Sequence, residues 1–214
     1  GLRKLIGERQ GLTGANVAIA HGAGGMLETL AKTFILPGDE VVLPRQTYGL
    51  YREISLFMGA TLRTVELDDH HRLRLTDVME RVSEKTKLVW ICNPNNPTGT
   101  TMRETDLRPL FDVLPDHAWL VLDEAYMEFA DPKALPESVP AIEDDKRIIV
   151  VRTFSKAYGL AGARLGYALS RPDAIRAIDT VAEPFNANRV GLAGATAVLT
   201  EDLTAVAEAR SRII

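Results

Sequence analysis

A lysine that follows an apolar, strand-like run is the residue of this sequence that is best placed to take part in a reaction. Lys156 comes directly after the run RIIVVRTFS, and small residues separate it from Arg164, so the chain can turn back between the two. A lysine just past a buried strand can be partly desolvated, and a desolvated amine is a nucleophile. Most lysines are simply solvated, so Lys156 needs partners before it indicates a reaction.

A second candidate is the carboxylate of Asp123, at the end of the apolar run in LVLDEAY. Burying a carboxylate without a partner is costly, so Asp123 is expected to have one. It could be a helix cap or a member of a salt bridge. A magnesium ligand is another possibility, but no phosphate-gripping lysine motif accompanies it.

Two loops carry further candidates. The segment HGAGG, residues 21–25, follows a strand-like run and opens a helix. Its glycines and free N–H groups suit an anion, although it completes neither a Walker A loop nor a dinucleotide fingerprint and could be a tight turn. The segment NPNNPTG, residues 93–99, follows another strand-like run, and its prolines fix the backbone that presents Asn93, Asn95 and Asn96.

The elements that must position these residues alternate between strands and helices. Strands are predicted over 16–20, 40–44, 61–66, 86–92, 118–124, 147–154 and 163–170. Helices are predicted over 2–8, 26–35, 48–58, 75–82, 104–114, 171–181 and 190–214, with a loop rich in proline and acidic residues over 131–145. The strands are nearly continuous apolar runs, which is typical of a mostly parallel sheet covered on both faces. The pattern predicts an open α/β sheet, whose ligands sit at the carboxyl ends of its strands.

Composition excludes several classes of protein. The 214 residues are 46% hydrophobic and 25% charged, and no apolar run reaches the length that a membrane helix needs. The net charge is -4 and no basic stripe is present, so we expect neither a nucleic-acid partner nor a membrane. The single cysteine, Cys92, allows no internal disulfide, and we expect a cytoplasmic protein. No metal site is predicted, because His70, His71 and His117 form no cluster of ligands.

Four segments, HGAGG, NPNNPTG, DEAY and SKAYGLAGARLGY, occur in an order that resembles fold type I enzymes of pyridoxal 5'-phosphate (PLP). The resemblance is strongest to the class I and II aminotransferases, within them to the histidinol-phosphate aminotransferase group, and it covers nearly the whole chain. It implies a PLP-binding large domain over 1–185, with a mostly parallel central sheet and helices on both faces. Residues 186–214 would be a helix leading into a small domain that is mostly absent from this chain. The departures are His21, Gly24, Gly25 and Gln46, where the family usually has other residues, and they weaken the assignment to the subgroup.

The resemblance implies a role for each site residue. Lys156 would form the Schiff base with PLP and, once released by the substrate, act as general base in the 1,3-proton shift. Asp123 would pair with the pyridinium nitrogen and make the ring an electron sink. Tyr126 and Asn96 would hydrogen-bond the ring's phenolic oxygen, and Tyr48 would stack on the ring. The catalytic residues are then Lys156, Asp123 and Tyr126, and the phosphate is held by the N–H groups of Ala23 and Gly24, the hydroxyls of Thr153 and Ser155, and Arg164.

The implied reaction is a ping-pong transfer of an amino group from an amino acid, or an amine such as histidinol phosphate, to a 2-oxo acid. The resemblance also implies a homodimer with active sites at the subunit interface. Two alternatives share the same motifs: a decarboxylase of the threonine-phosphate type, and an aminotransferase-like domain that binds a ligand without turnover. The products formed from an amino acid would separate them.

Overall fold

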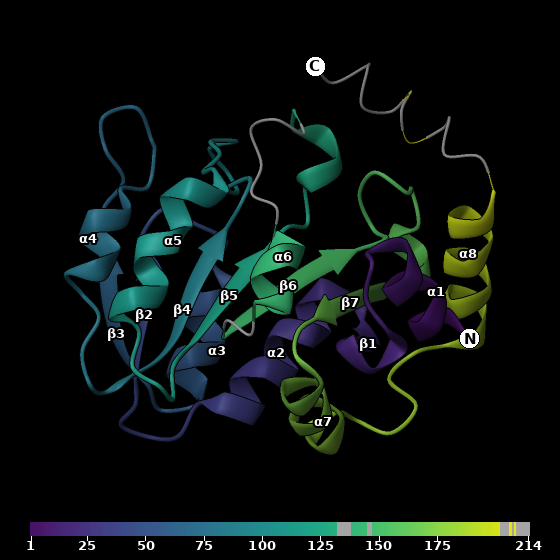
Figure 1. The fold of residues 1–214 in the computed structure, drawn as a ribbon, viewed down its shortest axis with the longest axis horizontal. Coiled ribbons are helices and arrows are strands. Elements are labelled where there is room, and N and C mark those ends of the chain that lie inside the picture. The colour runs from purple at the N-terminus through teal and green to yellow at the C-terminus, as the bar shows by residue number, and fades with distance from the viewer. Residues whose placement is uncertain (132–137, 145–146, 202–205, 207, 209–214) are drawn as a thin grey trace.

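The computed structural model describes residues 1–131, 138–144, 147–201, 206 and 208. Its strands are β1 (Val17–His21), β2 (Glu40–Pro44), β3 (Thr61–Val65), β4 (Thr86–Cys92), β5 (Trp119–Asp123), β6 (Ile148–Thr153) and β7 (Leu165–Leu169). Its helices are α1 (Leu2–Arg9), α2 (Gly22–Phe34), α3 (Leu50–Phe57), α4 (Leu75–Met79), α5 (Glu104–Val113), α6 (Ser138–Glu143), α7 (Pro172–Val181) and α8 (Arg189–Thr200), with short 3₁₀ turns at Gly14–Asn16, Met127–Phe129 and Ala161–Ala163 (Figure 1).

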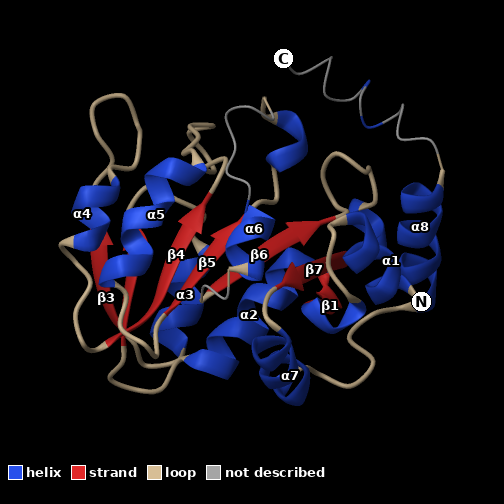
Figure 2. Cartoon of the chain, viewed as in Figure 1, coloured by secondary structure: helices blue, strands red, loops and turns tan. Residues whose placement is uncertain are grey.

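The strands form one sheet in the order β1-β7-β6-β5-β4-β2-β3. Strands β2 to β6 run parallel to one another, and β7 is antiparallel to both of its neighbours, β6 and β1. Helices lie on both faces of this sheet (Figure 2). The expected mostly parallel sheet with helices on both faces is therefore confirmed.

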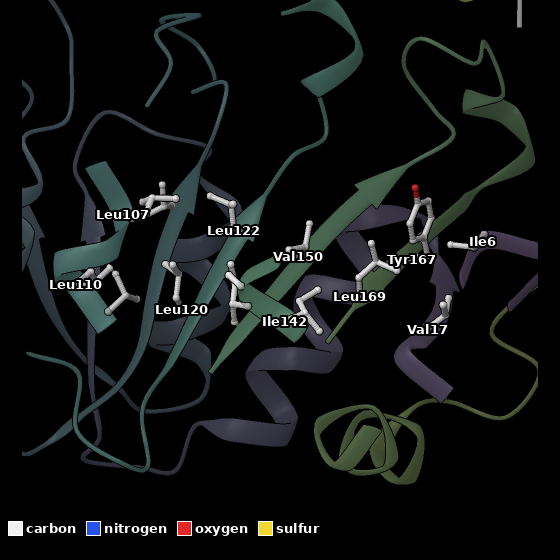
Figure 3. Packing of buried hydrophobic residues seen from close by; sticks show 14 of the residues in the cluster. Ile6, Val17, Leu107, Leu110, Leu120, Leu122, Ile142, Val150, Tyr167 and Leu169 are labelled. Atoms are coloured by element: carbon white, nitrogen blue, oxygen red, sulfur yellow. The ribbon is translucent and has the colours of Figure 1, made fainter. Parts of the chain in front are cut away.

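Each face of the sheet has its own apolar core, because successive side chains of a strand point to opposite faces. Leu120 and Leu122 of β5 and Val150 of β6 pack with α1, α5, α6 and α8 (Figure 3), and Val121 and Val151 pack with α2, α3 and α7. Strands covered on both faces are apolar at most positions. This is why their sequences read as continuous apolar runs.

Two sequence-based predictions about local structure are wrong. The segment 131–145 is not simply a loop, because α6 occupies Ser138–Glu143 and buries Ala141 and Ile142 on the sheet; residues 132–137 and 145 lie outside the described part. The helix expected over 26–35 begins earlier than predicted, because α2 starts at Gly22, so HGAGG opens the helix and is not a separate turn ahead of it. The helix expected over 190–214 ends at Thr200 with Glu201 as its cap, and most residues beyond lie outside the described part. The division at 185/186 stays a prediction.

A buried ion pair joins β6 to the segment after β5. Arg152 Nε donates to Glu124 Oε2 at 2.8 Å, and the two side chains are 6% and 3% exposed. Arg152 also donates to Gln10 Oε1 at 2.7 Å, just after α1. The pair therefore ties α1 and β6 to the carboxyl end of β5.

We expect Arg152→Met to lower the free energy of unfolding by about 3 kcal/mol, because it leaves the Glu124 carboxylate buried without its partner. Chemical denaturation measures this loss. The matched control is Arg3→Met, which breaks an exposed pair with Asp179 and should cost less than about 1 kcal/mol. Equal losses for the two variants would contradict the interpretation, whereas adding Glu124→Gln to Arg152→Met should recover part of the loss.

Candidate active site

The candidate site lies where β4, β5 and β6 end. Cys92 is the last residue of β4 and pairs in register with Asp123, the last residue of β5. Thr153 ends β6, and Ser155 and Lys156 follow it. The carboxyl ends of parallel strands meet at one edge of a sheet, so these side chains converge although their positions in the sequence are far apart.

A single cavity at this edge brings together all the residues that the sequence analysis selected. Lining it are Ala23, Gly24, Tyr48, Asn96, Asp123, Tyr126, Thr153, Ser155, Lys156 and Arg164. Cys92 and Ala125 also line it and were not selected. The cavity fixes which residues share a site, and their individual roles stay predictions.

Asp123 is the buried acid of this cavity. Its carboxylate accepts two hydrogen bonds, one from the Tyr51 hydroxyl at 2.6 Å to Oδ2 and one from the Ala125 N–H at 3.0 Å to Oδ1. Burial raises the pKa of Asp123 from its ordinary 3.8 to about 6, while these two hydrogen bonds act in the opposite direction. Above that pH the cavity therefore contains a buried anion, ready to accept a hydrogen bond from a cationic N–H group.

Lys156 provides the amine. Its Nζ lies 5.1 Å from the centre of the Tyr126 ring, in the range of a cation–π contact. Lys156 is exposed in this chain. The reason is geometric: β6 ends at Thr153, and the turn that follows carries Lys156 past the edge of the sheet into the open cavity.

The anion-binding end of the cavity is the start of α2. The cap residue His21 makes no side-chain hydrogen bond to the helix, so it does not cap the N–H groups of the first turn. The turn lies against β7 so closely that a Cβ on Gly166 would be 2.5 Å from the Ala23 nitrogen. Gly22 has a φ of +75°, and a Cβ on it would be 2.6 Å from Arg164 Nη2. Only glycine at these positions brings the helix start and the guanidinium together.

The hydroxyl groups of Thr153 and Ser155, near this end of the cavity, differ in the hydrogen bonds that they form within the protein. Thr153 Oγ1 donates to the Leu165 carbonyl at 3.3 Å and accepts from the Ser155 N–H at 3.1 Å. Its single proton is thus used within the protein, and Thr153 positions Ser155. Ser155 Oγ accepts from Arg164 Nη1 at 3.4 Å, and this contact does not use the hydroxyl proton of Ser155.

The asparagine-rich loop presents one of its three asparagines to the cavity. Asn93 is buried and exchanges two hydrogen bonds of 2.9 Å with the backbone of Met102. Asn95 donates to the Gln46 carbonyl and to Thr98, and accepts from Thr47. Asn93 and Asn95 therefore brace the loop, and Asn96 lines the cavity.

Tyr48 and Tyr51 lie where α3 begins, and Tyr48 lines the cavity. Tyr48 is 40% exposed and meets Tyr51 edge-on, with ring centres 5.6 Å apart. Tyr48 was predicted from the sequence as a site residue and Tyr51 was not, although Tyr51 is fully buried and donates to Asp123. The spacing of the two tyrosines could have suggested that both belong to one helix end, but nothing in the sequence connects Tyr51 with Asp123.

Within the described ranges, no three acidic, histidine or cysteine side chains gather in a way that could hold a metal ion. None of the helices in the same ranges is both long and apolar enough to cross a membrane.

Comparison with known proteins agrees with this geometry. The family model for aminotransferase class I and II matches residues 2–214. The chain belongs to the class I and II aminotransferases. Among its relatives, the histidinol-phosphate aminotransferases of Geobacillus thermodenitrificans and of an Anaeromyxobacter species are each 36% identical, over 94% and 100% of this chain. A solved histidinol-phosphate aminotransferase from Sinorhizobium meliloti, in complex with PLP, superimposes with a TM-score of 0.90 at 36% identity over 98% of this chain.

This class I and II aminotransferase chain covers 54% and 58% of the length of those two relatives and 56% of the solved chain. The part it shares with them includes the whole cavity described above.

Proposed function

We propose that this chain binds PLP in the cavity at the ends of β4 to β6 and takes part in transamination between an amino acid, or an amine such as histidinol phosphate, and a 2-oxo acid. The observation that supports this most is the joint presence of an amine, a buried acid and an anion-binding helix start in one cavity. Membership of the aminotransferase family and the 36% identity to histidinol-phosphate aminotransferases support the same reaction.

The residues of the cavity fit the cofactor. The N–H groups of Ala23 and Gly24, Ser155 and Arg164 would hold the phosphate, and Asp123 would accept a hydrogen bond from the protonated ring nitrogen. Tyr48 would stack on the ring. Tyr126 and Asn96 would contact its phenolic oxygen, and Thr153 would support the phosphate through Ser155. When bound, PLP supplies an aldehyde that condenses with amines and a ring that stabilises negative charge on the adjacent carbon.

Lys156 is the residue that moves protons in this proposal. Its Nζ would hold the cofactor covalently until a substrate amine displaced it. The released amine of Lys156 would then be the base that takes the proton from the substrate's α-carbon and the acid that returns it. The Tyr126 ring, whose centre is 5.1 Å from Nζ, would lie beside this amine.

Amino-group transfer can be tested directly on the full-length protein. With PLP, ¹⁵N-labelled histidinol phosphate and 2-oxoglutarate, we expect ¹⁵N in the glutamate that forms, detected by mass spectrometry. A second reaction uses carboxyl-¹³C-labelled threonine phosphate, and release of ¹³CO₂ without ¹⁵N transfer would favour a decarboxylase instead. If neither reaction proceeds in a protein that binds PLP, a ligand-binding domain without turnover becomes the better interpretation.

Arg164 should affect the phosphate end of the cavity alone. We expect Arg164→Ala to weaken PLP binding by about 10- to 100-fold, because charge-assisted hydrogen bonds to a phosphate are lost. Affinity for pyridoxal, which lacks the phosphate, should change little. Fluorescence titration with both compounds measures the difference, and Arg72→Ala, in an exposed ion pair with Asp68, is the control. An equal loss of affinity for PLP and for pyridoxal would show that Arg164 does not act on the phosphate.

We further propose that the protein is a cytoplasmic homodimer. The family resemblance supports a dimer, and so do apolar side chains that are largely exposed in the single chain, among them Phe57, Phe185 and Val190. Light scattering on the purified protein gives the mass that tests the dimer.

A further inference from the structure

Tyr51 is a buried tyrosine whose hydroxyl reaches the acid of the site. It lies on α3, none of its side chain is exposed, and its hydroxyl donates to Asp123 Oδ2 at 2.6 Å. An O–H···O contact of this length is typical of a hydrogen bond to an ionised carboxylate.

The Tyr51 ring is held in place from two sides. It stacks on Trp90 of β4, with ring centres 5.3 Å apart and planes only 8° apart, and Tyr48 meets it edge-on. Trp90 is itself fixed, because its Nε1 donates to Ser55 Oγ at 3.1 Å. Tyr51 and Ser55 are one helical turn apart on α3, so this helix holds the indole through both side chains. The hydroxyl of Tyr51 thus has a fixed direction toward Asp123.

The surroundings of Asp123 leave few other groups that could stabilise its charge. The titratable groups that face it are Tyr51 from α3, Cys92 from β4, its neighbour Glu124 and Lys156 from the turn after β6. Burial raises the pKa of the Cys92 thiol to about 12, so this neighbour is neutral, and Glu124 repels the charge. Within the described residues Asp123 forms no ion pair, so its nearest stabilising contacts are the Tyr51 hydroxyl and the Ala125 N–H.

We propose that Tyr51 is a positioning residue that keeps the Asp123 carboxylate charged and oriented so that it can receive a protonated ring nitrogen. This inference rests on the proposed binding of PLP. Tyr51 contacts Asp123 and is not among the residues that line the cavity, so it acts through the carboxylate. The ring of a phenylalanine would preserve both aromatic contacts, and the hydroxyl is therefore the part of Tyr51 that this role requires.

The first test uses Tyr51→Phe without cofactor. The Asp123 carboxyl signal is followed by ¹³C NMR against pH, with Asp123→Asn to assign it. Losing one hydrogen bond to a charged group should move its midpoint upward by about one to two pH units. A midpoint that stays in place would overturn the proposal.

The second test measures binding of PLP. Tyr51→Phe should weaken it by about 10-fold near neutral pH and less at alkaline pH, where Asp123 is ionised in both proteins. In an Asp123→Asn background the same change should have little effect, because the partner that transmits it is gone. A loss of equal size in both backgrounds would assign Tyr51 a purely structural role.

The matched control is Ser55→Ala, which removes the hydrogen bond to Trp90 from the same cluster without touching Asp123. It should lower the melting temperature and leave the Asp123 midpoint unchanged. If Tyr51→Phe does not fold, 3,5-difluorotyrosine at position 51, a stronger donor, should move the midpoint downward, and no movement would contradict the proposal. Failure of the unaltered protein to bind PLP would refute the proposed function, whereas the cofactor-free NMR titration would still decide whether Tyr51 controls Asp123.

Discussion

Replacing Lys156 by alanine should abolish the covalent attachment of PLP and reduce amino-group transfer by about 10³-fold or more. The loss is large because one side chain supplies both the nucleophile and the base. Mass spectrometry after borohydride reduction shows the first effect: the unaltered chain should gain one reduced PLP adduct, which a peptide map places on Lys156. In Lys156→Ala the adduct should be absent, while some non-covalent binding of PLP persists through Arg164 and the start of α2.

The control for this result is another lysine on the same sheet. Lys85→Ala alters an exposed lysine just before β4, whereas Lys156 follows the carboxyl end of β6. Because β4 and β6 run in the same direction, these two lysines lie at opposite ends of the strands. Lys85→Ala should therefore keep both the adduct and the activity. An adduct that survives in Lys156→Ala would show that a different amine is the nucleophile.

Strand positions could be predicted from the sequence because their physical cause is local. The strands β2 and β4 have the bounds that were predicted from their mostly apolar runs, since burial on both faces favours apolar residues at most positions. Helix starts were less predictable. Glycines normally mark turns, yet residues 22–25 form the first turn of α2. A glycine is required at Gly22, where φ is +75° and a Cβ would be 2.6 Å from Arg164 Nη2.

The residues of the candidate site were predictable only as a set of motifs. Each motif follows a strand of the sheet or begins a helix, and the rule that ligands bind at the carboxyl ends of strands brings the motifs together. The internal contacts of the site were not predictable. The hydrogen bond from Tyr51 to Asp123 joins residues 72 positions apart. The Thr153 hydroxyl donates to the Leu165 carbonyl on the neighbouring strand β7. Contacts of this kind depend on the packed structure, which the motifs do not encode.

Asp123→Asn should have opposite effects on stability and on activity. Without cofactor, the variant should be more stable at about pH 8 by 1 to 3 kcal/mol, because folding no longer buries a charge. The sign follows from the pKa: in the folded protein it is raised from 3.8 to about 6, so the folded state binds protons more readily than the unfolded state. The stability of the unaltered protein therefore falls as the pH rises through this interval, and that of Asp123→Asn should not.

Activity should change in the other direction. An asparagine can still bond with the Tyr51 hydroxyl and the Ala125 N–H, but it has no charge with which to hold a proton on the ring nitrogen. We expect amino-group transfer to fall by about 10²- to 10³-fold, in line with the loss of one buried electrostatic contact at a reacting centre.

Urea denaturation at about pH 8 and about pH 5, with and without PLP, measures the stability effect. The gain from Asp123→Asn should shrink at the lower pH, where Asp123 is already largely protonated, and PLP should stabilise the variant less than the unaltered protein. A variant that is less stable than the unaltered protein at the higher pH would mean that the carboxylate contributes more through its hydrogen bonds than it costs through burial. A gain in stability combined with a loss of turnover would instead identify Asp123 as a residue whose charge opposes folding and supports the reaction, as expected for a buried acid whose partner is the cofactor.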